Sequence, residues 1–290
     1  MRHYDFVTVD VFSSKPLEGN QLAVFTNATG MSDAEMQAFA CETRLSETTF
    51  VFPRPPELER EHGVRVRIFT IESEIPFAGH PTLGTAYVLA QARGERQITL
   101  DLGVGRIPVS FTERDGSLFG MMTQRDPEFG RTHRVEEVAA AAGIPLDAIE
   151  RSLPIQSVST GFEFTIVALK SLATARALRV DVPRMREYLG GALFYFVTRE
   201  TEYETARLHA RMQFFGGEDP ATGSEAGCAA AWMVRHGVAK SGEEVMIEQG
   251  LEILRPSRIY VSATIDGSAV RNVRVGGHVV EVMRGHALLP

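Results

Sequence analysis

The alternation of apolar and polar residues predicts that the first half of the chain is rich in short β-strands. Residues 4–11 alternate in this way, and a turn-rich segment separates them from a second apolar run, Leu22–Phe25. Ser32 and Glu35 have the spacing of a capping box, and apolar residues then recur at helical spacing, which predicts a helix over 33–43. β-branched and aromatic residues predict further strands over 48–52, 64–71, 98–102 and 107–111.

The second half repeats this mixture of strands and helices. The same patterns predict strands over 155–169, 192–198 and 205–215, and helices over 134–142, 183–189 and 223–236. Turn-forming and polar residues gather between 115 and 133. We therefore expect two domains, residues 1–127 and residues 128–290, with the last strands able to pack back on the first half.

Composition excludes some classes of function. The chain has 290 residues, 44% of them hydrophobic, so it can bury a large core. Its net charge of -7 argues against binding to nucleic acid, where Lys and Arg must replace the counterions of the phosphates. We expect small-molecule or protein partners instead.

The chain shows neither a signal peptide nor an apolar run long enough to span a membrane. Its two cysteines, Cys41 and Cys228, lie in helix-like segments away from any second thiol. We therefore expect a cytoplasmic protein that does not associate with membranes.

A short pattern occurs twice, about half the chain apart. Residues 80–85 read His-Pro-Thr-Leu-Gly-Thr, and residues 219–224 read Asp-Pro-Ala-Thr-Gly-Ser. The first copy follows Phe77-Ala78-Gly79 and the second follows Phe215-Gly216-Gly217, and each leads into an alanine-rich helix. The pattern thus consists of a polar residue, Pro, two further residues, Gly and a hydroxyl at a predicted helix start.

Such a pattern suits a binding site for an anionic group. Glycine lets the backbone approach a ligand closely, and the first N–H groups of a helix have no partner within the helix. Two such helix starts facing each other would hold a carboxylate or a developing enolate. The alternative is a structural turn from strand to helix with ordinary caps.

Three titratable residues are candidates for acid/base chemistry. His80 and Asp219 occupy the same position in the two copies, although His80 also suits a structural hydrogen bond and Asp219 suits a helix N-cap. Glu47 enters an apolar strand, where burial would raise its pKa toward neutrality. From the residues alone, an exposed glutamate at a strand start remains an alternative for Glu47.

Other kinds of chemistry lack their sequence signals. The histidines and cysteines do not have the spacing of metal ligands, and no nucleotide-binding loop or nucleophile elbow is present. Ser224 has no identifiable base in the sequence, so we interpret it as a binding group and not a nucleophile. We expect neither a metal nor a cofactor.

Several stretches together resemble one known family. They are 9–12, 16–20, 45–51, 77–81, 218–224, 248–250 and 255–257. At these residues the chain resembles the phenazine-biosynthesis (PhzF-like) proteins, whose fold is similar to that of diaminopimelate epimerase. The resemblance covers nearly the whole chain.

The resemblance implies a fold and a set of residue roles. The fold would be α+β, with two pseudo-twofold-related domains, each a barrel-like sheet around a central helix, and the active site in the cleft between them. The residue matching Glu47 is the main proton carrier, and those matching His80 and Asp219 assist it. The residues matching Gly79, Gly223 and Ser224 help to hold the substrate. A homodimer is also implied.

The resemblance further implies a cofactor-independent isomerase that acts on a small substrate with a carboxylate. The best-defined member isomerises trans-2,3-dihydro-3-hydroxyanthranilate. Epimerase relatives use two cysteines as bases, but neither copy of the pattern begins with a cysteine, and Cys228 is expected to be buried inside its helix. The alternatives are an isomerase or epimerase of another amino or hydroxy acid and a non-catalytic protein that binds a small ligand.

Overall fold

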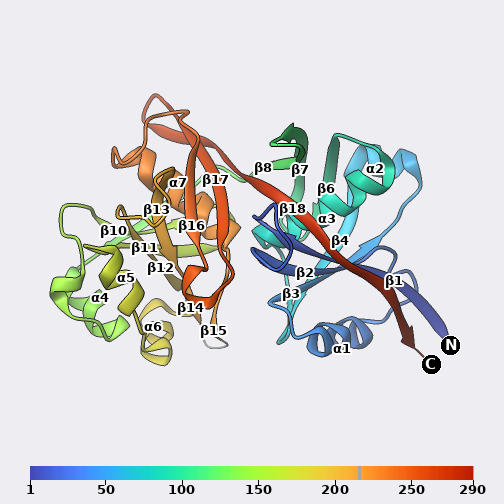
Figure 1. Cartoon of the computed structure of the whole chain (residues 1–290), viewed down its shortest axis with the longest axis horizontal. Helices are drawn as coiled ribbons and strands as arrows, with labels where there is room; N and C mark the ends of the chain where they lie inside the picture. The colour runs from blue at the N-terminus through green and yellow to red at the C-terminus, as the bar shows by residue number, and fades with distance from the viewer. Residues whose placement is uncertain (215–216, 290) are drawn as a thin grey trace. The chain divides into compact units, whose positions relative to one another are not determined.

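The chain has a mixed α/β fold. The computed structural model describes residues 1–214 and 217–289, in which seven α-helices accompany a large sheet of sixteen strands (Figure 1). The chain divides into two compact units, residues 1–123 with 276–290 and residues 124–275. The long last strand belongs to both, because the division falls within it.

The first unit is built mainly from strands. These are β1 (Arg2–Val11), β2 (Asn20–Phe25), β3 (Glu47–Phe52), β4 (Val64–Thr70), β5 (Glu74–Ile75), β6 (Gln97–Leu102), β7 (Gly105–Arg114), β8 (Ser117–Thr123) and the later part of β18 (Ala269–Leu289). The helices are α1 (Asp33–Thr43), α2 (Pro56–His62) and α3 (Gly79–Arg93). Among the described residues, none of the helices is long and apolar enough to cross a bilayer.

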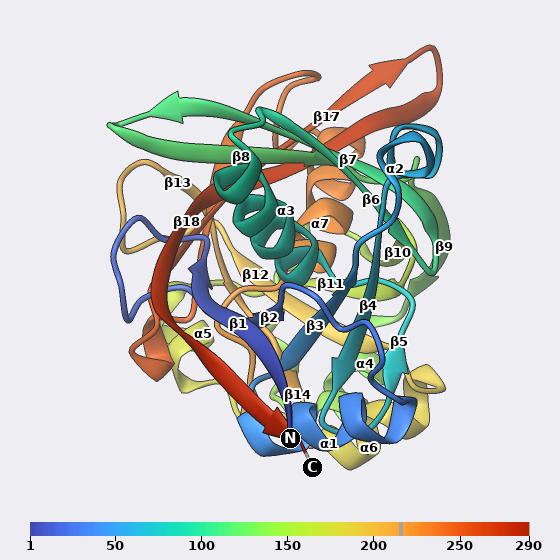
Figure 2. The ribbon, with the colours of Figure 1, turned by 90° about the vertical axis from the view of Figure 1, so that its right-hand side faces the viewer.

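Six strands of the first unit contact one largely buried helix. The strand order of the unit is β1-β2-β3-β4-β6-β7-β8-β18, and β18 also pairs with β1, antiparallel (Figure 2). The helix α3 contacts β1, β2, β3, β6, β7 and β8, and its first seven residues are all buried. Gly84 permits this approach, because a Cβ at that position would lie 2.7 Å from Leu22 Cδ2.

The second unit combines a mixed sheet with more helices. Its strands are β9 (Glu128–His133), β10 (Ile155–Ser159), β11 (Glu163–Ala168), β12 (Leu193–Thr198), β13 (Ala206–Arg211), β14 (Gln213–Phe214), β15 (Gly217–Glu218), β16 (Val245–Gln249), β17 (Ser257–Asp266) and the start of β18. Its helices are α4 (Val135–Ala142), α5 (Leu172–Ala177), α6 (Val182–Leu189) and α7 (Gly223–Arg235), with short 3₁₀ helices η1 (Leu146–Ala148) and η2 (Leu251–Ile253).

In the second unit α7 has the buried position. The strand order is β18-β17-β16-β13-β12-β11-β10-β9, and α7 packs against β17, β10 and β11. Twelve of its residues, Gly223–Val234, are buried. The helices α4, α5 and α6 lie near one another in the second unit (Figure 1). They share a separate apolar core with β12, which includes Phe194 and Met185.

Most predicted elements are confirmed, with small shifts at their ends. The helix over 33–43 and its Ser32–Glu35 capping box are present as predicted. The single strand predicted over 155–169 is wrong, because the chain forms two antiparallel strands, β10 and β11. Gly161, with φ 139°, lies in the turn between them. The strand predicted over 205–215 is divided into β13 and β14, and Phe215 lies outside the described residues, as does Gly216.

Candidate active site

The first set of predicted residues, Glu47, Gly79 and His80, lies within the first unit. Glu47 begins β3 and is largely buried, so the exposed alternative does not apply. Gly79 and His80 are the first two residues of α3, and His80 is 3% exposed. Its Nε2 lies 3.3 Å from Glu47 Oε2. The fold therefore brings the two proposed proton-handling groups of this unit into direct contact.

His80 is neutral at physiological pH. Burial lowers its pKa to about 3, and a backbone hydrogen bond with Gln21 opposes this only in part. The amide Nδ2 of Asn20 lies 3.1 Å from His80 Nδ1, and an amide nitrogen can only donate. This contact favours the tautomer with its proton on Nε2, the nitrogen that lies 3.3 Å from Glu47 Oε2. No hydrogen bond of normal geometry joins Nε2 to that oxygen, and a neutral imidazole does not form an ion pair with the carboxyl.

The turn before β2 fixes Asn20. Leu17 N–H donates to Asp10 Oδ2 at 2.7 Å, which closes the turn. Gly19 has φ 73°, and a Cβ there would lie 2.3 Å from the carbonyl oxygen of Val11, so only glycine fits. Asn20 then pairs with Val11 in the ladder between β1 and β2 and is 1% exposed. The segment read from the sequence as a turn thus also orients the imidazole.

Threonines connect β3 to the central helix of the first unit. Thr49 Oγ1 lies 2.8 Å from Thr85 Oγ1, and both side chains are completely buried. Thr85 is the hydroxyl residue of the first copy of the repeated pattern. Its role in the structure is to fasten α3 to the strand that begins with Glu47.

The second set, Asp219, Gly223 and Ser224, lies within the second unit. Asp219 is 5% exposed, and its carboxylate Oδ2 accepts a hydrogen bond from the hydroxyl of Thr222. Gly223 and Ser224 are the first two residues of α7 and are both buried. The N-cap of α7 is Thr222, so capping does not account for Asp219.

Gln249, at the end of β16, holds the loop that carries Asp219. Its Nε2 donates to the carbonyl oxygen of Asp219 at 2.9 Å and to Thr222 Oγ1 at 3.0 Å. Its Oε1 accepts from Thr222 N–H at 3.2 Å and from the Tyr195 hydroxyl at 3.0 Å. Gly250 permits this contact, because a Cβ there would lie 2.5 Å from the carbonyl oxygen of Pro220. One buried amide therefore fixes Asp219 and Thr222 of the loop.

The two copies of the repeated pattern occupy different positions relative to their helices. The helix α3 begins one residue before His80, whereas α7 begins four residues after Asp219. The expectation that both copies stand at a helix start therefore needs correction for the second copy, whose Asp-Pro lies in the preceding loop. The reason is that Gln249 and Asp219 bind the groups of Thr222 and keep this segment extended.

The structure disfavours a mechanism with two thiols. Cys228 is completely buried in α7, as expected, and burial raises the pKa of its thiol to about 12. Cys41 is exposed on α1. A thiol with so high a pKa is not a proton carrier near neutral pH.

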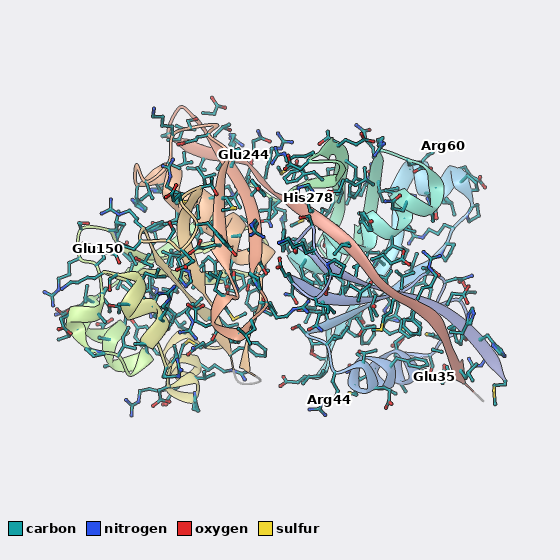
Figure 3. The ribbon with its side chains drawn as sticks, in the orientation of Figure 1. Glu35, Arg44, Arg60, Glu150, Glu244 and His278 are labelled. Atoms are coloured by element: carbon teal, nitrogen blue, oxygen red, sulfur yellow. The ribbon has the colours of Figure 1, made fainter. Side chains whose placement is uncertain are left out.

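Two further buried histidines have structural partners. His278, labelled on β18 in Figure 3, has its Nδ1 2.9 Å from Ser117 Oγ and packs edge-on against Phe119. His209 is enclosed by two carboxyl groups, Glu248 and Glu252.

Sequence reasoning gave no role to Asn20, Thr222, Gln249 or Glu225. Asn20, Thr222 and Gln249 lie inside the stretches that resemble the family. The resemblance therefore identified their positions but assigned them no roles. Glu225 lies outside these stretches. Thr222 and Glu225 have the spacing of a capping box, which in a sequence indicates a helix start. The structure does not form that box, since Thr222 makes no capping hydrogen bond with its side chain.

Comparison with known proteins identifies the family. The chain matches the model of the phenazine biosynthesis-like proteins over residues 9–285. It is 35% identical to trans-2,3-dihydro-3-hydroxyanthranilate isomerase of Pseudomonas aeruginosa, over 98% of this chain and 99% of that protein. The structure is similar to that of a PhzF-family phenazine biosynthesis protein of Bacillus anthracis, with a TM-score of 0.88, 27% identity and 100% of both chains covered.

A more distant likeness concerns the fold alone. A hydroxyproline epimerase from Agrobacterium vitis is 12% identical, with a TM-score of 0.67 over 99% of this chain and 91% of that one.

The family and the reaction class expected from the sequence are therefore confirmed. The chain belongs to the phenazine biosynthesis-like protein family and is an isomerase.

Proposed function

We propose that this isomerase moves a proton on a small carboxylate-bearing substrate without a cofactor, and that trans-2,3-dihydro-3-hydroxyanthranilate is that substrate. The P. aeruginosa relative bears the name of this reaction and matches the chain over nearly its whole length. The observation that carries the proposal is the 3.3 Å contact between Glu47 and a neutral, buried His80.

In the proposed reaction Glu47 removes a proton from a ring carbon. His80 Nε2, which lies 3.3 Å from Glu47 Oε2, then donates a hydrogen bond that stabilises the charge that develops during transfer. Because the imidazole has a pKa of about 3, it acts as a hydrogen-bond donor and does not compete for the substrate's proton. Glu47 then returns the proton at a distant ring carbon.

The second-unit residues would act on the same substrate molecule. Asp219 orients or exchanges a proton with the amino or hydroxyl group, and Gly79, Gly223 and Ser224 bind the substrate through the first turns of α3 and α7. Helix N-termini favour anions, which suits a carboxylate-bearing substrate.

We also propose features that the family resemblance implies for the whole molecule. They are a homodimer and two pseudo-twofold-related domains, residues 1–127 and 128–290 with the last strands packed back on the first half, each a barrel-like sheet around a central helix. The cytoplasmic location expected from the sequence is proposed with them. The pairing of β18 with both β8 and β1 supports closure of the first sheet. The six strands in contact with α3 support its central place.

The proposed function is tested by incubating the protein with trans-2,3-dihydro-3-hydroxyanthranilate in heavy water and following the substrate by NMR. Turnover with deuterium incorporation is expected for the wild type. Glu47→Gln removes the proton carrier but keeps the shape of the side chain, so a rate loss on the order of 10²-fold or more is expected, with binding retained.

Glu42→Gln is the matched control, because Glu42 is exposed at the end of α1, five residues before Glu47. Its rate should equal that of the wild type. Wild-type turnover that survives in Glu47→Gln would refute the assignment of Glu47. An inactive wild type that still folds would refute the proposed substrate and direct a screen of other small amino and hydroxy acids.

A further inference from the structure

Glu225 is a fully buried carboxyl group that the proposed reaction does not yet use. It lies in the first turn of α7, next to Ser224, and is 0% exposed. Within the described part of the chain neither of its carboxyl oxygens has a hydrogen-bond partner. A buried polar group without a partner destabilises a fold, so stability does not explain this residue.

Helix capping does not explain Glu225 either. In a capping box its carboxyl would accept from the backbone N–H of Thr222. That N–H donates to Gln249 Oε1 at 3.2 Å instead, and the Thr222 hydroxyl donates to Asp219. The loop around Asp219 thus takes both groups that would otherwise engage Glu225.

Thr222 lies between the two carboxyl groups. Its hydroxyl has one proton, which goes to Asp219 Oδ2, and two lone pairs, one of which accepts from Gln249 Nε2 at 3.0 Å. The remaining lone pair of the Thr222 hydroxyl can only accept a hydrogen bond, so its partner must carry a proton. The hydroxyl interacts with the Glu225 carboxyl, although no hydrogen bond of normal geometry joins them. Glu225 can donate to it only when it is protonated.

The surroundings favour the protonated form of Glu225. Burial raises its pKa well above the ordinary value, and the negative charge of Asp219 raises it further. The other titratable groups that act with this pair are Tyr195 of β12 and Cys228 of α7, whose pKa values are themselves raised by burial. A proton on Glu225 leaves this pair of buried carboxyl groups with one negative charge, which lies on Asp219.

We propose that Glu225 is a positioning residue that stores the proton of Asp219 and exchanges it through the hydroxyl of Thr222. The O–H bond of Glu225 breaks as Thr222 Oγ1 accepts its proton, and the hydroxyl proton of Thr222 passes to Asp219 Oδ2. Asp219 thereby becomes the acid and Glu225 the carboxylate, and the reverse transfer restores the resting state. No net proton is consumed.

This relay rests on the proposed function, because it gives Asp219 both of the states that an isomerisation needs. Asp219 accepts from the substrate as a carboxylate and donates to it as an acid, without water entering the buried loop. The negative charge moves between Asp219 and Glu225, so the two carboxyl groups are never ionised at the same time.

The Glu225→Gln variant separates the proposed storage of a proton from a purely structural role of this side chain. The glutamine amide can donate to Thr222 Oγ1 but cannot give up a proton. We expect kcat to fall on the order of 10²-fold, while KM changes by less than roughly twofold. Thr222→Val should give a similar loss, Thr222→Ser should restore most of the rate, and the Glu225→Gln/Thr222→Val double variant should be no slower than either single variant.

Cys228→Ala is the matched control, because Cys228 is equally buried on the same helix one turn further along. Its kcat should equal that of the wild type. A Glu225→Gln variant with wild-type kcat and wild-type pH profile would overturn the relay and leave Glu225 as a structural donor.

A measurement without substrate separates this proposal from the proposed function. At neutral pH, the infrared absorption of a protonated carboxylic acid should be present in the wild type, absent in Glu225→Gln and retained in Glu47→Gln. If the wild type fails to turn over the substrate but shows this band, the proposed substrate is wrong. The proposal that Glu225 holds a proton in the resting protein is then still supported. If Glu225→Gln leaves the absorption unchanged, the store itself is refuted.

Discussion

Replacing His209 by Leu tests whether a buried cluster of charges supports the second unit. His209 lies in β13 and is completely buried, with Nδ1 2.9 Å from Glu248 Oε1 and Nε2 3.0 Å from Glu252 Oε1. Glu248 also accepts the backbone N–H groups of residues 202 and 203. Leucine would leave both carboxyl groups without their shared partner.

The loss follows from the burial of the cluster. Removing one partner of a buried ion pair costs about 3–5 kcal/mol, because the remaining charge stays desolvated. At about 2–4 °C for each kcal/mol, the melting temperature of the His209→Leu variant should fall by roughly 6–20 °C. His286→Leu is the control, since its pair with Asp5 is exposed on the surface and should contribute less than about 1 kcal/mol.

The pH dependence provides a second signature. Burial lowers the pKa of His209, but hydrogen bonds with Glu248 and Glu252 outweigh this and raise it. Its stabilisation is therefore complete below 6.5, the ordinary value, and is lost as the pH rises through the raised pKa. Burial raises the pKa of Glu252, but His209 outweighs this and lowers it, so that stabilisation is lost as the pH falls below 4.5.

The difference between the wild type and His209→Leu should therefore be widest between about pH 4.5 and 6.5. Circular dichroism during heating, at several pH values, measures it. A melting temperature that falls no more than that of His286→Leu at every pH would refute the argument, because it would show that the buried carboxyl groups do not need the imidazole.

Three other outcomes are expected from packing and burial. Gly227→Ala should lower the stability by about 1–3 kcal/mol in chemical unfolding, because its Cβ would lie 1.9 Å from Gln124 Oε1. A thiol reagent should label Cys41 alone in the native protein and Cys228 only after denaturation. In an NMR titration His80 should stay neutral from pH 8 to pH 5, and its burial should cost stability as the pH falls below 6.5, the ordinary pKa.

The elements that sequence patterns predicted well are those with local signals. The helix α1 has a complete capping box, and strands β4 and β6 alternate largely between buried and partly buried residues. The division of residues 155–169 into two strands was not predicted, because Gly161 is the only glycine in the run and no proline interrupts it. Buried strands on both sides of such a turn have no alternation to mark their ends.

The candidate site was located from the sequence, but its connections were not. The repeated pattern and the family resemblance identified Glu47, His80 and Asp219, and the structure shows that Glu47 and His80 are in contact. The partners of these groups come from distant parts of the chain, such as Asn20 for His80 and Gln249 for the loop of Asp219. Such pairings depend on the fold, so local periodicity carries no signal for them.

The last strand has a consequence for the order of events during synthesis. Residues 124–275 form a contiguous unit, which has all its strands except the end of β18 once residue 275 has left the ribosome. The first unit needs residues 276–289, which pair with β1 at the opposite end of the chain. Domains usually fold in the order in which they are made. In this protein the half that is translated first must wait for residues 276–289, so a product that stops before residue 276 would contain a folded second unit attached to an unfinished first one.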